Sequence, residues 1–279
     1  MFQRLLRDLA VKLFGIVGEA GFKSSLFRRV FLTLYSGYKQ YLEAGAIDEL
    51  KQFVAEGSVV IDVGANVGFF SRRFATWVGP RGKVILLEPE EHNFKALQSM
   101  IERSGFIGRT RLMKAAAAER TGKALFKVNP RHPGDHKLSA DGTGVAVDTV
   151  RLDELVVDKH KDRPGLVKID VQGAELAVLR GAPDILRQAG PALFVELDEN
   201  GLRKFGASVK DILDYLDGFG YAAFWLEKGG RRTSATDNDI AARIVEFGYV
   251  DVLFLLVNSV GASQQSPGDG NSRQVPSAC

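Results

Sequence analysis

A glycine turn after an apolar run is the first candidate for chemistry. Residues 58–63 are apolar except at Ser58 and Asp62, residues 64–68 read Gly64-Ala65-Asn66-Val67-Gly68, and a helical pattern begins at residue 69. Glycine adopts backbone conformations that a Cβ opposes, and it lets a ligand approach the carboxyl edge of an open α/β sheet. A plain strand-to-helix turn uses the same residue types, so the turn alone identifies no ligand.

The next apolar run ends in an acid. Residues 83–88 lead to Glu88, which is followed by Pro89. An acid about 20 residues after such a turn accepts hydrogen bonds from ribose hydroxyls in nucleotide-binding βαβ units. A solvated carboxylate at a strand end is the alternative, but turn and acid together favour a ligand that contains a nucleoside.

The charge at the first strand end narrows the choice of nucleotide. A dinucleotide site favours Gly-x-Gly-x-x-Gly with a helix N-terminus facing a pyrophosphate, and Asp62 would repel that anion. A cationic sulfonium cofactor with an amino-acid tail suits the acid better. The chain also lacks the Gly-x-x-x-x-Gly-Lys-Ser/Thr phosphate loop of ATP-dependent enzymes.

Two further apolar runs, residues 166–170 and 192–197, place Asp170 and Glu196 at the same predicted edge. A hydroxyl that accepts a methyl group needs a base or a metal. Either carboxylate suits the base, and the two together could ligate Mg²⁺, although no other feature of the sequence supports a metal. The alternative is that Asp170 and Glu175 cap the next helix. Lys168 faces the cofactor or acceptor, or pairs with an acid.

A polar segment, residues 129–144, separates the third and fourth predicted strands. It contains Gly and Pro and two of the four histidines of the chain, His132 and His136. We interpret it as a loop over the carboxyl edge that forms the acceptor site. A histidine there suits proton transfer near neutral pH, and a solvent-exposed loop histidine is the alternative.

An alternating series of strands and helices is predicted to position these residues. Strands are predicted at residues 58–63, 83–88, 111–116, 166–170, 192–197, 221–227 and 249–257, and helices at 69–77, 92–103, 174–179 and 208–216. Apolar strands between helices indicate a mostly parallel sheet that is covered on both faces. A polar stretch, in place of a strong amphipathic helix, separates the last two strands, which predicts an antiparallel pair closing the sheet.

The flanks differ from this central region. Residues 1–46 are basic, with apolar residues at helical spacing, and predict helices that contact a membrane surface or pack on the main domain. Residues 259–279 are rich in Ser, Gly, Gln and Pro and predict a disordered tail. The expected organisation is therefore an extension (1–46), a main domain (47–258) and a tail (259–279).

Composition excludes several classes. The 37 Lys and Arg against 34 Asp and Glu give a net charge of +3, which does not indicate nucleic-acid binding. The single cysteine, Cys279, excludes an intramolecular disulfide and a cysteine-based metal site. No apolar run is long enough to span a bilayer and no signal-peptide cleavage site is clear, so a cytoplasmic location is expected.

Four segments in order resemble the FkbM-type methyltransferases: DVGANVG from Asp62, LEP from Leu87, DTVRLDEL from Asp148, and VKIDVQGAE from Val167 followed by VLRG. The resemblance covers roughly residues 46–257. It implies a Rossmann-like class I fold with a seven-stranded sheet and an antiparallel last strand. It also implies S-adenosylmethionine as the cofactor and, usually, O-methylation of a sugar, glycan or natural product.

By position, the resemblance implies roles for individual residues. The methionine end of the cofactor would be lined by Asp62, Gly64, Ala65, Asn66 and Gly68, the ribose held by Glu88 beside Pro89, and the adenine placed near Ala116 and Ala117. The segment PGDH resembles a turn of the family and favours His136 over His132.

Three alternatives compete with an O-methyltransferase. An N-methyltransferase would suit an Asn-Pro-Pro-Tyr motif, which is absent from the sequence. An NAD-dependent oxidoreductase would need a third glycine at the expected spacing. A catalytically inactive nucleotide-binding or partner-binding module of the same fold disagrees with the intact turn and Glu88.

Overall fold

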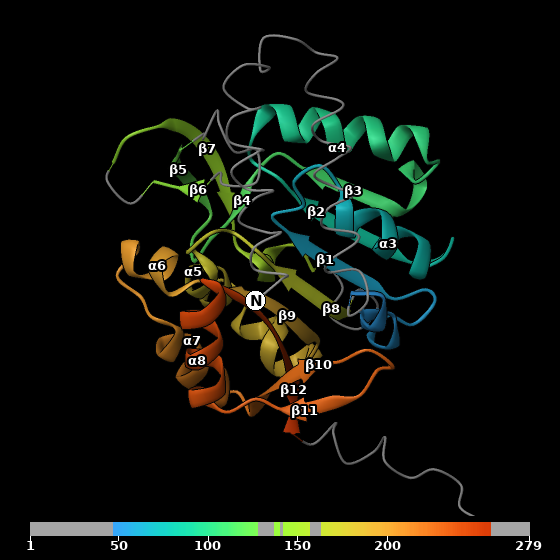
Figure 1. Ribbon diagram of the computed structural model, residues 1–279. Coiled ribbons are helices and arrows are strands. Elements are labelled where there is room, and N and C mark those ends of the chain that lie inside the picture. The colour runs from blue at the N-terminus through green and yellow to red at the C-terminus, as the bar shows by residue number, and fades with distance from the viewer. Residues whose placement is uncertain (1–46, 128–136, 140–141, 157–162, 258–279) are drawn as a thin grey trace, which may run out of the picture.

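The computed structural model describes residues 47–127, 137–139, 142–156 and 163–257, and these build an α/β fold around one large sheet (Figure 1). The eight strands of the sheet lie in the order β11-β10-β12-β9-β8-β1-β2-β3. They are β1 (Val59–Val63), β2 (Lys83–Leu87), β3 (Thr110–Met113), β8 (Pro164–Ile169), β9 (Ala192–Leu197), β10 (Tyr221–Leu226), β11 (Arg232–Ser234) and β12 (Val250–Leu256).

The strand directions match the expected fold class. The five strands from β3 to β9 are parallel, whereas β12 runs antiparallel to both β9 and β10. The Rossmann-like sheet with an antiparallel last strand is therefore confirmed. The short strand β11 pairs antiparallel with β10 at the sheet edge and adds an eighth strand to the seven expected.

Helices cover both faces of the sheet. One face packs against η1 (Asp48–Phe53), α3 (Phe69–Trp77) and α4 (Glu91–Arg103). The other packs against α5 (Glu175–Arg180), the π-helix η4 (Ile185–Ala189), α6 (Glu199–Lys204), α7 (Val209–Asp217) and α8 (Asp237–Phe247). Two short 3-10 helices, η2 (Ile107–Arg109) and η3 (Leu152–Glu154), complete the described elements.

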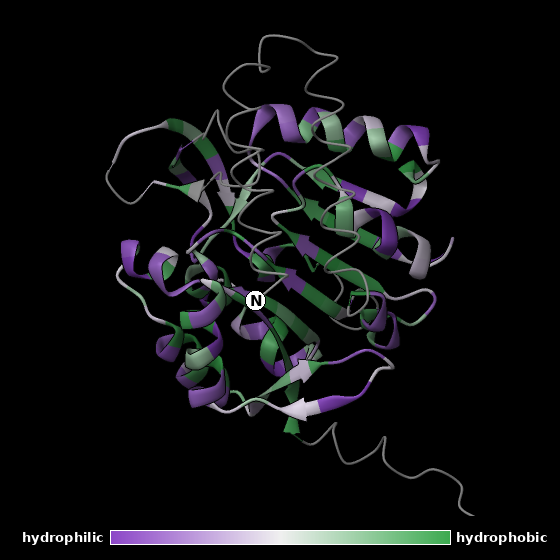
Figure 2. Ribbon diagram, in the orientation of Figure 1, coloured by the Kyte–Doolittle hydropathy of each residue, from purple (hydrophilic) through white to green (hydrophobic). Residues whose placement is uncertain are grey.

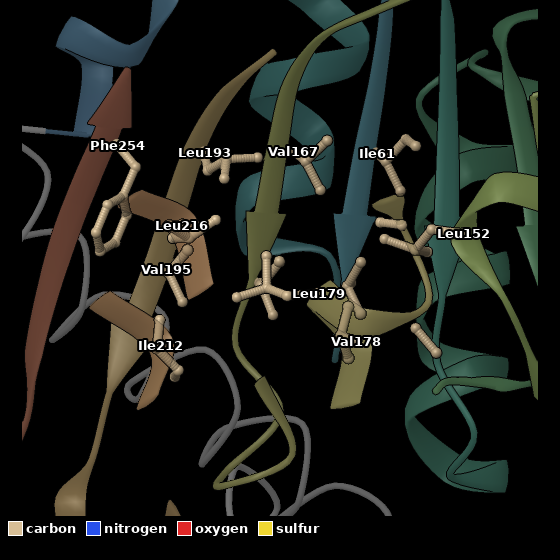
Figure 3. Packing of buried hydrophobic residues seen from close by; sticks show 14 of the residues in the cluster. Ile61, Leu152, Val167, Val178, Leu179, Leu193, Val195, Ile212, Leu216 and Phe254 are labelled. Atoms are coloured by element: carbon tan, nitrogen blue, oxygen red, sulfur yellow. The ribbon is translucent and has the colours of Figure 1, made fainter. Parts of the chain in front are cut away.

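The alternation of side chains along the central strands explains this arrangement. In β1, Ile61 and Val63 join the core under α5 and α7, while Val60 joins the core under α3. Figure 3 shows the first of these cores, where Leu216 of α7 lies beside Leu193 and Val195 of β9, and Ile61 of β1 lies beside Leu152. The central strands are accordingly mostly apolar, with a few hydrophilic positions, and the helices carry both kinds of residue (Figure 2). Burial of each such Val, Ile or Leu side chain contributes roughly 1.5–3 kcal/mol.

A second, four-stranded sheet follows β3 and was not expected. Its strands β4 (Ala116–Ala117), β5 (Gly122–Lys127), β6 (Lys137–Leu138) and β7 (Val145–Val150) lie in the order β4-β7-β5-β6. Figure 1 shows it on the side toward which β1 and β8 point. The interpretation of residues 129–144 as a loop was therefore wrong for residues 137–138, which pair with β5. Because β5 and β7 are largely exposed, they lack the apolar signal of the central strands.

Two other expectations need correction. The predicted strand 111–116 ends early: β3 stops at Met113, and residues 116–117 pair with β7 in the second sheet. The stretch before the last strand is not merely polar, because it forms α8, whose start is fixed by a capping box between Thr236 and Asp239. Only Ile240 of α8 is buried, so the helix has a weak apolar pattern.

The predicted helices in 1–46 and the tail 259–279 lie outside the described residues, so the division into three regions stays a prediction. Within the described ranges, no helix combines the length and the apolar character needed to cross a membrane.

Candidate functional site

Strand register brings the candidate acids to one edge of the main sheet. The pairings of β2 with β1, of β1 with β8 and of β8 with β9 align four residues in a row: Leu87, Val63, Ile169 and Val195. The next residue along each chain lies one step further toward the carboxyl edge. These residues are Glu88, Gly64, Asp170 and Glu196. The expectation that the acids share this edge is confirmed.

Asp62 is fully buried in β1, two residues before the edge residue Gly64, on the face that packs against α3. Its Oδ2 accepts a hydrogen bond of 2.7 Å from the hydroxyl of Ser71 in α3. Its Oδ1 accepts no hydrogen bond from the described residues and lies 3.5 Å from Nζ of Lys168. Desolvation by burial raises the pKa of Asp62, and the nearby charge of Lys168 lowers it.

Lys168 is the side chain whose direction the sequence left open. Its register partner in β1 is Asp62. Its ammonium donates to the carbonyl oxygen of Gly64 at 2.9 Å, lies 3.4 Å from Oδ2 of Asp170, and lies over the ring of Phe70. The buried cation therefore ties the glycine turn to two acids on neighbouring strands.

Glu88 lies at the end of β2, with 4% of its surface exposed. Its Oε2 accepts from the backbone N–H of Asn66 at 2.8 Å, and its Oε1 accepts from that of Glu90 at 2.9 Å. Burial raises the pKa of Glu88 to about 7, although both hydrogen bonds act in the opposite direction. The link to Asn66 places this carboxylate against the glycine turn, as expected for one site.

The glycines of the turn are favoured by their backbone conformations, and Gly64 is also required by a close backbone contact. Gly64 has a φ of 74°, and a Cβ there would lie 2.0 Å from the backbone oxygen of Asp170. Gly68 has a φ of 92°, and a Cβ would lie 2.4 Å from Cε of Met100 in α4. Asn66 also has a positive φ, 51°, which asparagine tolerates better than most residues. The turn thus fixes how closely β1 approaches β8 and how α4 packs, in addition to any role in ligand approach.

Asp170 and Glu196 meet through a third side chain. Nε2 of Gln172 donates to Oδ1 of Asp170 at 3.1 Å and to Oε2 of Glu196 at 2.6 Å. Gln172 has no distinguishing feature in the sequence except its place in the VKIDVQGAE segment. Within the described part of the chain, no three His, Cys, Asp or Glu side chains gather as a metal site. The amide nitrogen takes the position between the carboxylates that a shared cation would need, so the Mg²⁺ option has no support.

Glu175 binds backbone N–H groups of the loop that precedes α5. Its Oε1 accepts from the backbone N–H groups of Val171 at 3.2 Å and Gly173 at 3.0 Å. Burial raises the pKa of Glu175 to about 7. Asp170 and Glu175 are both candidate caps of this helix from the sequence, and Glu175 is seen to bind backbone N–H groups of the preceding turn. Asp170 faces Lys168 and Gln172.

The remaining predicted site residues lie around this edge. Ala65 is buried in the turn and Pro89 is half-buried after Glu88. Ala116 and Ala117 are buried in β4, after the point where the chain leaves the main sheet. Their proximity to an adenine stays a prediction. His136 and His132 lie outside the described residues.

The DTVRLDEL segment has a structural role that sequence reasoning did not assign. The carboxylate of Asp153 accepts from the backbone N–H groups of Asp184 at 3.2 Å and Ile185 at 3.0 Å, and pairs with Arg151. Leu152 is buried in the core under α5. The segment follows β7 of the second sheet, and through Asp153 it binds the start of η4.

Comparisons with known proteins identify related methyltransferases. The model of the methyltransferase FkbM domain matches residues 62–223. Among curated proteins, the hexuronic acid methyltransferase AglP of Haloferax volcanii is 30% identical over 146 residues, 52% of this chain and 58% of that protein. The 2-O-methyltransferase NoeI of Sinorhizobium fredii is 27% identical over 180 residues, 58% of this chain and 72% of that protein.

A solved structure of an FkbM methyltransferase from Methylobacillus flagellatus KT is 20% identical, with a TM-score of 0.46 over 72% of this chain and 44% of that one. The chain thus spans little more than half of the length of AglP, and less than half of the protein in this structure. The family model alone covers more than half of the chain and runs from Asp62 through the VKIDVQGAE segment. The chain belongs to the FkbM methyltransferase family.

Proposed function

We propose that this protein transfers a methyl group from S-adenosylmethionine to a hydroxyl oxygen of a sugar, glycan or natural product. The observation that carries the proposal is the contact between Glu88 and Asn66, which joins a buried carboxylate to the glycine turn. Family membership supports the reaction class.

The residues at the edge fit the proposed cofactor. Each oxygen of Glu88 accepts one backbone N–H, and a carboxylate has about four acceptor sites, so ribose hydroxyls can donate to the others. Among the described residues, Asp62, Asp170 and Glu196 bring three carboxylates to this edge and Lys168 brings one ammonium. This excess of negative charge favours a cofactor with a sulfonium and an ammonium group.

The bound cofactor would supply a methyl group on a sulfonium sulfur, which becomes a neutral thioether when the methyl group is transferred. The protein must then hold the acceptor hydroxyl in line and take up its proton. Asp170 is the proposed proton acceptor, because its carboxylate is about one-fifth exposed at the edge, whereas Asp62 is buried. His136 is a second candidate base, and Glu196 is proposed to orient the acceptor beside Asp170.

The acceptor class rests on the relatives. One acts on a hexuronic acid and another is a 2-O-methyltransferase. The first name specifies a sugar acid and the second an oxygen acceptor, so a sugar hydroxyl agrees with both. The carboxylates of Asp170 and Glu196 suit such an acceptor, because carboxylates accept hydrogen bonds from hydroxyl groups.

The first test is calorimetric titration of the whole chain with S-adenosylhomocysteine, with NAD⁺ as the parallel control. Micromolar binding of S-adenosylhomocysteine alone is expected. Glu88→Ala should weaken it by about 1.5–3 kcal/mol, the scale of hydrogen bonds to a charged group. Binding of NAD⁺ alone would overturn the proposal.

The second test is turnover with a panel of simple glycosides, measured as release of S-adenosylhomocysteine. Asp170→Asn should slow turnover at least tenfold while the affinity for S-adenosylhomocysteine changes little. Equal losses in both would make Asp170 structural. Cofactor binding without methyl transfer to any hydroxyl compound would favour the inactive binding module.

A further inference from the structure

Gln172 has a backbone conformation that is unusual for its residue type. Its φ is 59°, and among the described residues only Asn66 is another non-glycine residue with a positive φ. The left-handed region costs about 1–2 kcal/mol for a residue with a Cβ, and asparagine is several-fold enriched there whereas glutamine is not. Such residues persist where the surrounding structure holds them, and they cluster at functional sites.

Contacts on both sides of Gln172 hold this conformation. The N–H groups of Val171 and Gly173 both donate to Oε1 of Glu175, whose side chain is almost completely buried. Gly173 has a φ of 112°, and a Cβ there would lie 2.5 Å from the backbone carbon of Gly201. The residues before and after Gln172 are therefore fixed independently of its own side chain.

The result of this arrangement is the position of one amide nitrogen. Nε2 of Gln172 lies 3.1 Å from Oδ1 of Asp170 and 2.6 Å from Oε2 of Glu196. A primary amide has two N–H groups, so each carboxylate receives one. Such a bond is stronger to an ionised carboxylate than to a protonated carboxyl group, so it favours the ionised form, and the amide separates two like charges.

We propose that Gln172 is a positioning residue that holds Asp170 and Glu196 as an ionised pair, which keeps Asp170 ready to take the proton of the acceptor hydroxyl. The inference rests on the proposed function. The inference goes beyond the proposed function, because Gln172 acts through the two carboxylates and does not bind the cofactor.

Other charges around the pair act in both directions. Lys168 lies 3.4 Å from Oδ2 of Asp170 and favours its ionised form. Nearby carboxylates oppose it, namely those of Asp62 in β1 and Glu175 in α5. Asp251 of β12, the strand-register partner of Glu196, is a further carboxylate near the pair. With Lys168 unchanged, replacement of the amide by a third carboxylate makes one member of the cluster take up a proton at higher pH, because like charges at hydrogen-bond distance do not all ionise.

The test compares Gln172→Glu and Gln172→Asn with the wild type. The first keeps the shape and adds a charge, and the second keeps an amide that tolerates the left-handed conformation but is too short to reach both carboxylates. Gln98→Glu is the matched control, because Gln98 also donates to a carboxylate, that of Glu102, but on the exposed surface of α4. The titration midpoint of the Asp170 carboxyl is measured by ¹³C NMR and assigned with Asp170→Asn.

In Gln172→Glu we expect this midpoint to move up by at least one pH unit, and in Gln172→Asn by a smaller amount, with Gln98→Glu unchanged. With a glycoside acceptor, the rising limb of the kcat–pH profile should move in the same direction while affinity for S-adenosylhomocysteine stays within threefold. An unmoved midpoint in both folded Gln172 variants would overturn the inference. Failure of the wild type to bind S-adenosylhomocysteine would instead overturn the proposed function.

Discussion

The ammonium of Lys168 lies 3.5 Å from Oδ1 of Asp62, and both side chains are almost completely buried. Burial alone penalises the ionised carboxylate and raises its pKa, whereas the adjacent cation lowers it. Because the two residues are register partners on β1 and β8, the pair also joins the two strands that carry the glycine turn and Asp170. Charge compensation and site geometry therefore depend on one contact.

Lys168→Met should destabilise the protein by about 3–5 kcal/mol, because it leaves Asp62 as an uncompensated buried charge. Denaturant unfolding measures this loss. The double variant Asp62→Asn, Lys168→Met removes both charges and should lose less than the sum of the two single variants. Strictly additive losses would show that the two residues do not interact.

Binding of S-adenosylhomocysteine should depend on the protonation of Glu88. Burial raises the pKa of Glu88 to about 7, so the carboxylate that accepts ribose hydroxyls becomes protonated as the pH falls below that value. We expect the affinity to fall by up to tenfold per pH unit below about pH 7. Calorimetry from pH 5.5 to 8.5 checks this, and Glu88→Gln should bind more weakly at high pH without the dependence. A Glu88→Gln curve parallel to that of the wild type would assign the pH dependence to another group.

Gly64→Ala should be far more damaging than Gly105→Ala. Both glycines have similar positive φ values, 74° and 69°, but a Cβ at Gly64 would lie 2.0 Å from the oxygen of Asp170, whereas nothing lies within 4 Å at Gly105. We expect a loss of about 1–2 kcal/mol for Gly105→Ala from backbone strain alone, and about 3–5 kcal/mol for Gly64→Ala. Unfolding free energies measure both, and equal losses would mean that the contact with Asp170 is not tight in solution.

Glu175 should make stability fall as the pH rises. Its pKa is raised in the folded protein to about 7 from 4.5, so its contribution to stability is complete below pH 4.5 and is lost as the pH rises through 7. The Tm of the wild type minus that of Glu175→Gln should be greater at pH 5 than at pH 8 by roughly 5 °C, since each kcal/mol moves the Tm of such a domain by about 2–4 °C. The same Tm difference at both pH values would contradict the shift.

The local patterns that predicted the fold are those of fully buried elements. The strands β1, β2, β8 and β9 are apolar on both faces, and α3 begins and ends at the residues expected. Errors arose where elements are exposed. β5 and β7 alternate polar and apolar residues weakly, and α8 buries only Ile240, so neither shows the periodicity of a core element.

Local sequence patterns were enough to place Asp62, Glu88, Asp170 and Glu196 at or near the carboxyl ends of four strands, with the glycine turn between the first two. Which of them touch depends on the tertiary structure. The bond from Lys168 to Gly64 spans 104 residues, and the bonds from Gln172 join the ends of two strands. Hydrophobic periodicity is a local property and places a residue on a face, whereas such contacts depend on strand register and on the backbone conformation of single residues, which are fixed when the whole sheet and its helices pack.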